Sequence, residues 1–175
     1  MRALDLTANG LLLAMLGIAA ISDLRSHRIP NWLVLAGLQA AWLVQVFGHG
    51  ISAGSWAWLT GAAAGLAPFL VLYLIGALGA GDAKLMASIG AFVGVQAALH
   101  IVVASFLLGG VMAVTIMLTR KHARQTLASL SARLLWLPFG WRATATGNDQ
   151  METTARLPYA VAMAGGVLLV MAGTL

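Results

Sequence analysis

The chain has 175 residues, of which 61% are hydrophobic and only 9% are charged. Soluble domains average about 25% charged residues, so a water-facing surface cannot be built from so few charges, and the sequence predicts an integral membrane protein. The absence of cysteine excludes disulfides, thiolate zinc sites and thiol nucleophiles. The net charge of +5 comes from basic residues too scattered for a nucleic-acid site, so no nucleic-acid partner is expected.

A membrane-spanning helix needs about 20 mainly apolar residues. The sequence offers about six such segments, at residues 4–21, 31–47, 56–78, 83–94, 96–118 and 157–174. The fourth is short for a crossing, and the spacing of Gly90 and Gly94 suits close helix packing, so we expect a short helix buried by its neighbours. Gly61 and Gly65 give the third segment the same spacing. These patterns predict an all-α polytopic protein, a bundle of about six transmembrane helices in one domain of residues 1–175.

The first apolar segment has an alternative interpretation as the core of a signal peptide. Ala19 and Ala20 supply small residues near a cleavage point, but the amino end carries only Arg2, offset by Asp5. Cleavage would leave Asp23 near a free terminus and invert the topology. We therefore interpret this segment as a membrane span.

Six crossings place every second connection on the same side of the membrane. Residues 22–30, residues 79–84 and a polar region at about residues 120–156 then share one face, which holds every Lys and Arg except Arg2. Because basic loops stay in the cytoplasm, this face is predicted to be cytoplasmic. Leucines at helical spacing within residues 120–156 also predict a helix lying in the membrane interface.

Two of the five acidic residues border apolar segments on that face. Asp23 lies in the run SDLRSHRIPN of residues 22–31, and Asp82 lies in the run GAGDAKL of residues 79–85. A simple alternative is that each carboxylate pairs with a nearby basic residue and marks a helix end near the headgroups. Gly79 and Gly81 favour a more specific role, because residues without side chains let another backbone approach.

Two carboxyl groups brought within a few ångströms cannot both ionise freely, so one keeps a proton. The ionised group can take a proton from water, which attacks a carbonyl carbon, while the protonated group polarises the carbonyl oxygen and protonates the leaving amine. This is aspartic proteolysis, which needs no metal or other cofactor. The four histidines are scattered without ligand spacing, so no metal site is expected. The composition and spacing of the sequence are compatible with this mechanism, but they do not by themselves distinguish it from others.

Three motifs resemble a known family. GAGDAKL resembles the GxGD motif of the prepilin peptidases, the type IV leader peptidases of bacteria. Asp23, followed by Arg25, Arg28 and the Ile-Pro-Asn turn, resembles the family's first aspartate motif. Residues 156–160, RLPYA, with Gly165 and Gly166 downstream, resemble the start of the family's last helix.

The resemblance implies a membrane-embedded aspartic endopeptidase with Asp23 and Asp82 as the catalytic pair. It implies a site at the cytoplasmic face of the bacterial inner membrane, with prepilins or pseudopilins as substrates that lose a short basic leader. Other pilus assembly proteins are candidate partners beside the lipid bilayer. Longer family members also methylate the new amino terminus through a cysteine-containing, zinc-binding portion. Without cysteine, this chain resembles the short peptidase-only type of Flp (tight-adherence) pilus systems, and no methyltransferase activity is expected.

The same motifs indicate residues that shape the site, namely Gly79, Gly81, Lys84, Arg28, Pro30, Asn31, Pro158 and Tyr159. Lys84 is expected to tune Asp82 or contact the substrate backbone, or else to anchor a helix end at the headgroups. Pro30 and Asn31 are expected to shape the turn after Asp23, although proline at a helix start has an ordinary structural explanation. Pro158 and Tyr159 are expected to border the cleft, unless the tyrosine is an interfacial anchor.

Other classes of function fit parts of the sequence. The presenilin and signal-peptide-peptidase group shares a GxGD motif but has a Pro-Ala-Leu element that is not found here. A small proton-coupled transporter would use aspartates as proton relays at mid-span. A structural subunit of a secretion or pilus assembly would need no chemistry. The depth of the aspartates in the membrane discriminates these classes, because relay residues should lie at mid-span, whereas Asp23 and Asp82 are predicted to lie at span ends.

Overall fold

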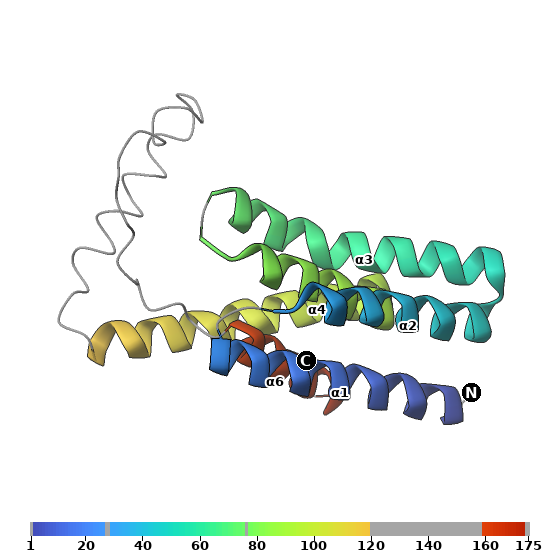
Figure 1. Cartoon of the computed structure of the whole chain (residues 1–175), viewed down its shortest axis with the longest axis horizontal. Helices are drawn as coiled ribbons and strands as arrows, with labels where there is room; N and C mark the ends of the chain where they lie inside the picture. Colours follow the sequence, from blue (N-terminus) through green and yellow to red (C-terminus); the bar gives the residue numbers. More distant parts are fainter. Residues whose placement is uncertain (1, 27–28, 76, 120–158, 174–175) are drawn as a thin grey trace. The chain divides into compact units, whose positions relative to one another are not determined.

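The computed structural model describes residues 2–26, 29–75, 77–119 and 159–173. Its elements are α1 (Arg2–Ser26), α2 (Asn31–His49), α3 (Ile51–Leu74), α4 (Ala80–Thr119) and α6 (Tyr159–Met171), shown in Figure 1. The described residues form helices and no strand, which confirms the all-α class. The predicted interfacial segment at residues 120–156 lies outside the described residues.

The chain divides into two compact units by its contacts. One unit comprises Met1–Gly110 and Pro158–Leu175, and the other comprises Val111–Leu157. The helices described below belong to the first unit, apart from the last turns of α4. The single domain of residues 1–175 stays a prediction.

Within the described part of the chain, four helices are long and apolar enough to cross a membrane, namely Leu6–Ser26, Asn31–His49, Ile51–Leu74 and Ala80–Thr115. The helix Tyr159–Met171 is apolar but shorter. This composition confirms a multi-pass membrane protein. The predicted number of about six spans is not confirmed, because the two spans expected at residues 83–94 and 96–118 fall within α4, which has a non-helical residue at Gly94, and α6 has only 13 residues.

The predicted boundaries of three helices were wrong. α1 continues through the polar cluster to Ser26, and α3 begins at Ile51 instead of residue 56 and ends at Leu74 instead of residue 78. α4 begins at Ala80, inside the predicted 79–84 connection. Polar residues at the edge of a membrane do not stop a helix, because its backbone groups are satisfied internally. As a consequence, Asp23 and Asp82 both lie on helices.

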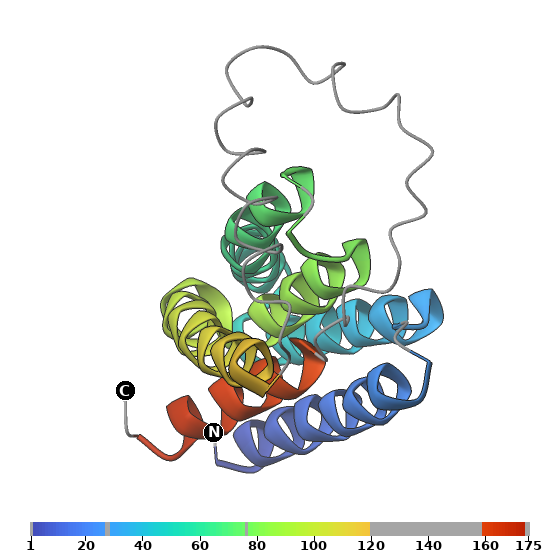
Figure 2. The ribbon, with the colours of Figure 1, turned by 90° about the vertical axis from the view of Figure 1, so that its left-hand side faces the viewer.

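α4 breaks at Gly94, as the sequence predicted. The φ of 77° and ψ of 176° there are non-helical, and the left-handed φ favours glycine. Before the break, α4 runs beside α2, with the Ser88 hydroxyl donating to the Val34 carbonyl at 3.2 Å. After the break it packs against α6, where Gly166 faces Ser105. The ribbon in Figures 1 and 2 changes direction at this point.

The segment of α4 before Gly94 lies in the centre of the unit. Most of its side chains are buried, including Leu85, Met86 and Ile89. It crosses α3 so closely that a Cβ added at Gly61 would collide with the Gly90 carbonyl, which confirms close packing at the predicted glycines. The short helix is therefore enclosed by its neighbours, as expected, and it carries Asp82 at its start.

Candidate active site

Asp23 lies in the last turn of α1, and its side chain is buried. Its Oδ2 accepts a hydrogen bond from the backbone N–H of Ala160, at 3.3 Å. The first N–H groups of a helix have no partner within the helix, so the first turn of α6 has a donor to offer. This contact joins residues at opposite ends of the chain and fixes one oxygen of the carboxyl group.

Asp82 lies in the first turn of α4 and is partly buried. Its Oδ2 accepts a hydrogen bond from the backbone N–H of Gly79, at 3.2 Å. This is the contact that the third residue of a helix makes when it reaches back to the residue before the helix. A Cβ on Gly79 would lie 3.3 Å from the same oxygen, so the glycine leaves room for the carboxyl group.

Asp23 lies at the end of α1 and Asp82 lies at the start of α4. The charge of Asp23 acts on the carboxyl group of Asp82, so the two groups lie within electrostatic reach of each other. The pair therefore comes together from two helices that are far apart in the sequence. Each member has one oxygen held by a backbone N–H.

The turn between α1 and α2 interlocks with the start of α4. A Cβ on Gly81 would lie 3.3 Å from the Cβ of Ile29, so the absence of a side chain lets the turn pack against α4. The Lys84 Nζ donates a hydrogen bond to the Asn31 Oδ1 at 3.2 Å. These two contacts connect the segment after Asp23 to the segment that carries Asp82.

Pro30 precedes the first residue of α2 with φ −66° and ψ 132°, and its carbonyl accepts the N–H of Leu33 at 3.1 Å. This is the ordinary role of a proline at a helix start. Of the other predicted site residues, Arg28 and Pro158 lie outside the described residues.

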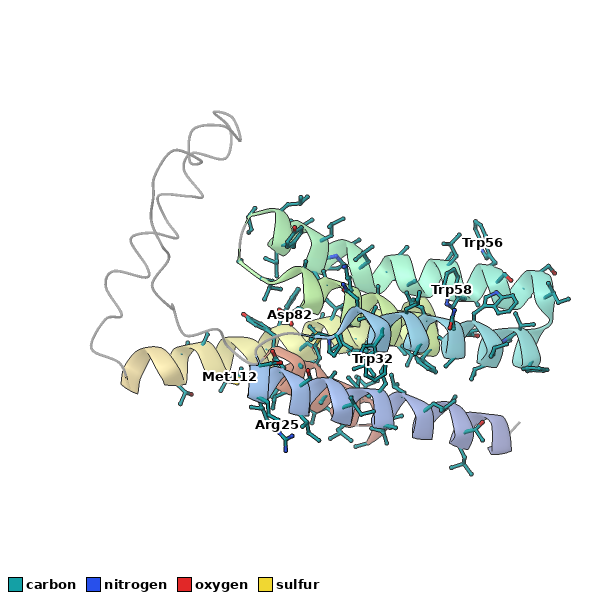
Figure 3. All side chains as sticks on the ribbon, in the orientation of Figure 1. Arg25, Trp32, Trp56, Trp58, Asp82 and Met112 are labelled. Atoms are coloured by element: carbon teal, nitrogen blue, oxygen red, sulfur yellow. The ribbon has the colours of Figure 1, made fainter. Side chains whose placement is uncertain are left out.

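The described basic residues near the pair are directed elsewhere. Arg25 is exposed and points away from the bundle in Figure 3, whereas Asp23 is buried. The ammonium group of Lys84 donates a hydrogen bond to the side chain of Asn31. Arg28, the other basic residue expected as a partner of Asp23, lies outside the described residues, so the charge-pair alternative for Asp23 is not tested.

Tyr159 is the first residue of α6 and is half-buried. The charge of Asp82 acts on its hydroxyl group. Its ring lies against the bare backbone of Gly109, where an added Cβ would come within 2.8 Å of the ring Cε1. Tyr159 thus belongs to the same end of the bundle as the two aspartates.

Sequence reasoning missed Ala160 and Gly109 as parts of this arrangement. Ala160 acts through its backbone N–H, which every residue except proline carries, so no sequence signal was present. Gly109 did leave a signal, since it forms a glycine pair with Gly110 inside an apolar helix. Among the residues that the structure describes, no three His, Cys, Asp or Glu side chains are grouped so as to hold a metal ion.

The sequence profile of the type IV leader peptidase family matches residues 10–114, more than half of the chain. The chain belongs to this family. The matched residues include Asp23, Asp82 and the turn between α1 and α2, whereas the RLPYA motif lies beyond them. No curated protein and no solved structure matches the chain.

Membership of the type IV leader peptidase family makes this multi-pass membrane protein a peptidase with a leader peptidase function, and it implies prepilins as substrates. The match does not separate the Flp type from other members, so that subtype stays a prediction.

Proposed function

We propose that the chain is an aspartic endopeptidase that uses Asp23 and Asp82 to remove the leader from prepilins or pseudopilins. The observation that carries this proposal is that the two carboxyl groups lie within electrostatic reach of each other, and each has an oxygen that accepts a hydrogen bond from a backbone N–H. Membership of the leader peptidase family supports the reaction class.

The chemistry needs one shared proton and one water. The ionised carboxylate takes a proton from water as the water oxygen attacks the scissile carbonyl carbon. The protonated carboxyl group donates to the carbonyl oxygen, and the leaving amine receives a proton as the C–N bond breaks. The two backbone N–H contacts support this scheme, because they keep each carboxyl group in a defined orientation before the substrate arrives.

Depth supports a protease over a transporter. Asp23 lies in the last turn of α1 and Asp82 in the first turn of α4, both at helix ends. A proton relay through the bilayer would need ionisable groups near the middle of its helices. The position of the pair instead suits a cleavage junction at the edge of the membrane.

The cytoplasmic face of the bacterial inner membrane is the proposed location of the site. Arg25 and Lys84 lie near the ends that carry the aspartates, whereas Arg2 starts α1 at its other end. Basic residues concentrate on the cytoplasmic side of membrane proteins. A peptidase-only enzyme of the Flp type is proposed because the chain has no cysteine for a zinc-binding methyltransferase portion.

Replacement of either aspartate tests the proposal. Asp23→Asn and Asp82→Asn keep the shape of the side chain and remove its acid–base chemistry, so we expect each to abolish cleavage. Each variant is co-expressed with a prepilin, and loss of the leader is followed by gel mobility. Asp5→Asn, a change on α1 far from its last turn, is the matched control and should cleave normally.

Membrane insertion of each variant is checked by its amount in the membrane fraction. If Asp23→Asn or Asp82→Asn still cleaves the prepilin completely, the paired-aspartate mechanism is wrong. In that case the membership of the family would stand, and the catalytic groups would have to be sought elsewhere in the chain.

A further inference from the structure

A cavity of about 510 Å³ lies at the ends of the helices that are remote from the aspartates. Its lining includes Asn9 near the start of α1, His49 at the end of α2 and Met171 at the end of α6. Asp23 lies in the last turn of α1, about 20 Å further along that helix than Asn9. The cavity is therefore separate from the candidate active site.

The inner walls of this cavity are apolar. Leu12 of α1, Ile101 of α4 and Val167 of α6 line it and are buried. Water inside a protein needs about two to four polar partners, and an engineered apolar cavity of about 150 Å³ stays dry. Water alone therefore does not suit the inner part of the cavity.

The exposed end of the cavity is polar. Asn9 and His49 line it from two different helices, and both residues are exposed. The amide of Asn9 and the imidazole of His49 both carry N–H donors. Gln45, one turn earlier on α2, also lines the cavity, but its amide already donates to two carbonyls of α4. The cavity thus combines hydrogen-bond donors at its exposed end with an apolar interior.

The surroundings of the cavity indicate which kind of molecule can enter it. The four described helices that are long and apolar enough to cross a membrane, α1, α2, α3 and α4, all contribute to its lining. The molecules around such helices are phospholipids, which have apolar chains and a headgroup with oxygen acceptors. The volume lies within the range of about 300–1,000 Å³ that is typical of ligand sites, which in helical bundles lie between the helices.

We propose that this cavity binds one phospholipid of the membrane leaflet remote from the aspartates. One acyl chain lies against Leu12, Ile101 and Val167. Phosphate or ester oxygens of the headgroup accept hydrogen bonds from Asn9 and His49. The site does not depend on the aspartic mechanism, because none of these residues belongs to the candidate active site.

Phenylalanine at either of two lining alanines tests the proposal, because the added ring fills the cavity. Ala8 on α1 and Ala57 on α3 line the cavity, whereas Ala14 and Ala53 on the same helices are exposed and lie outside its lining. Ala14→Phe and Ala53→Phe are therefore the matched controls. The delipidated full chain in detergent is titrated with dioleoyl phosphatidylethanolamine, and native mass spectrometry counts the phospholipid bound to each chain. A single elution peak in size-exclusion chromatography checks that each variant is folded.

The parent chain and both controls should bind one phospholipid. Affinity should fall by roughly 10- to 100-fold in Ala8→Phe and in Ala57→Phe, because the ring takes the place of the acyl chain. Asn9→Ala adds no volume and should weaken binding by roughly 10-fold, because the headgroup loses a donor. Oleic acid, which has the chain without the phosphate, should bind at least about 10-fold more weakly than the phospholipid.

Failure of the parent chain to bind phospholipid would overturn the proposal, as would equal affinities in the parent and both cavity-filling variants. An equal loss in the control variants would also overturn it, because that result describes lipid bound all around the apolar surface. Oleic acid that binds as tightly as the phospholipid would assign the cavity to a free fatty acid instead. A parent chain that elutes as a dimer, and that Ala8→Phe converts to a monomer, would assign the cavity to a second copy of the chain.

Discussion

Gln45 satisfies the backbone of α4 at the point where this helix breaks. The left-handed conformation of Gly94 separates the carbonyls that precede it from the N–H groups they would meet in a continuous helix. The Gln45 side-chain amide donates to the carbonyls of Ala91 at 3.2 Å and Phe92 at 3.0 Å. Gln45 is only 6% exposed, so water does not compete freely for these carbonyls.

Gln45→Leu removes both donors and keeps a side chain of similar size. Each buried carbonyl left without a partner costs about 1–3 kcal/mol, so two carbonyls cost about 2–4 kcal/mol after partial relaxation. For a chain of this length, that loss lowers the midpoint of thermal unfolding by roughly 5–15 °C. The six tryptophans allow the unfolding of the detergent-solubilised protein to be followed by intrinsic fluorescence.

Gln39→Leu is the matched control, because Gln39 lies on the same helix and is exposed. It should leave the unfolding midpoint almost unchanged. Equal midpoints for Gln45→Leu and Gln39→Leu would refute the reasoning, since they would mean that the broken helix does not depend on the Gln45 amide.

Two further predictions follow from the packing and the chemistry. Gly61→Ala should lower the unfolding midpoint, because overpacking typically costs about 1–3 kcal/mol and the new methyl group meets the Gly90 carbonyl. Gly17→Ala on α1 is the control and should not lower the midpoint, because nothing lies within 4 Å of an added Cβ there. Equal effects of the two changes would contradict the close crossing of α3 and α4. Metal chelators should leave the cleavage rate unchanged, since paired carboxyl groups activate water without a metal. Inactivation by a chelator that added metal reverses would contradict this scheme.

The sequence by itself determined the class of the protein and indicated the segments that we propose carry the chemistry. The scarcity of charged residues predicted a membrane protein. The long apolar segments predicted helices. Both predictions are possible from sequence because the free energy of transferring a side chain from water to lipid depends mainly on the type of residue. The break at Gly94 and the close crossing at Gly61 were also predictable, since glycine is the residue that permits both. The GxGD pattern by itself also indicates Asp82 as a candidate site residue.

Only the tertiary structure decided how the site is held together. The hydrogen bond from the backbone N–H of Ala160 to Asp23 has no signature in the sequence, because almost every residue carries the same backbone donor. The packing of Ile29 against Gly81 and the contact from Lys84 to Asn31 likewise depend on how separate helices meet. Local sequence decides which segments form helices, whereas the contacts between distant segments depend on the shape of the whole bundle.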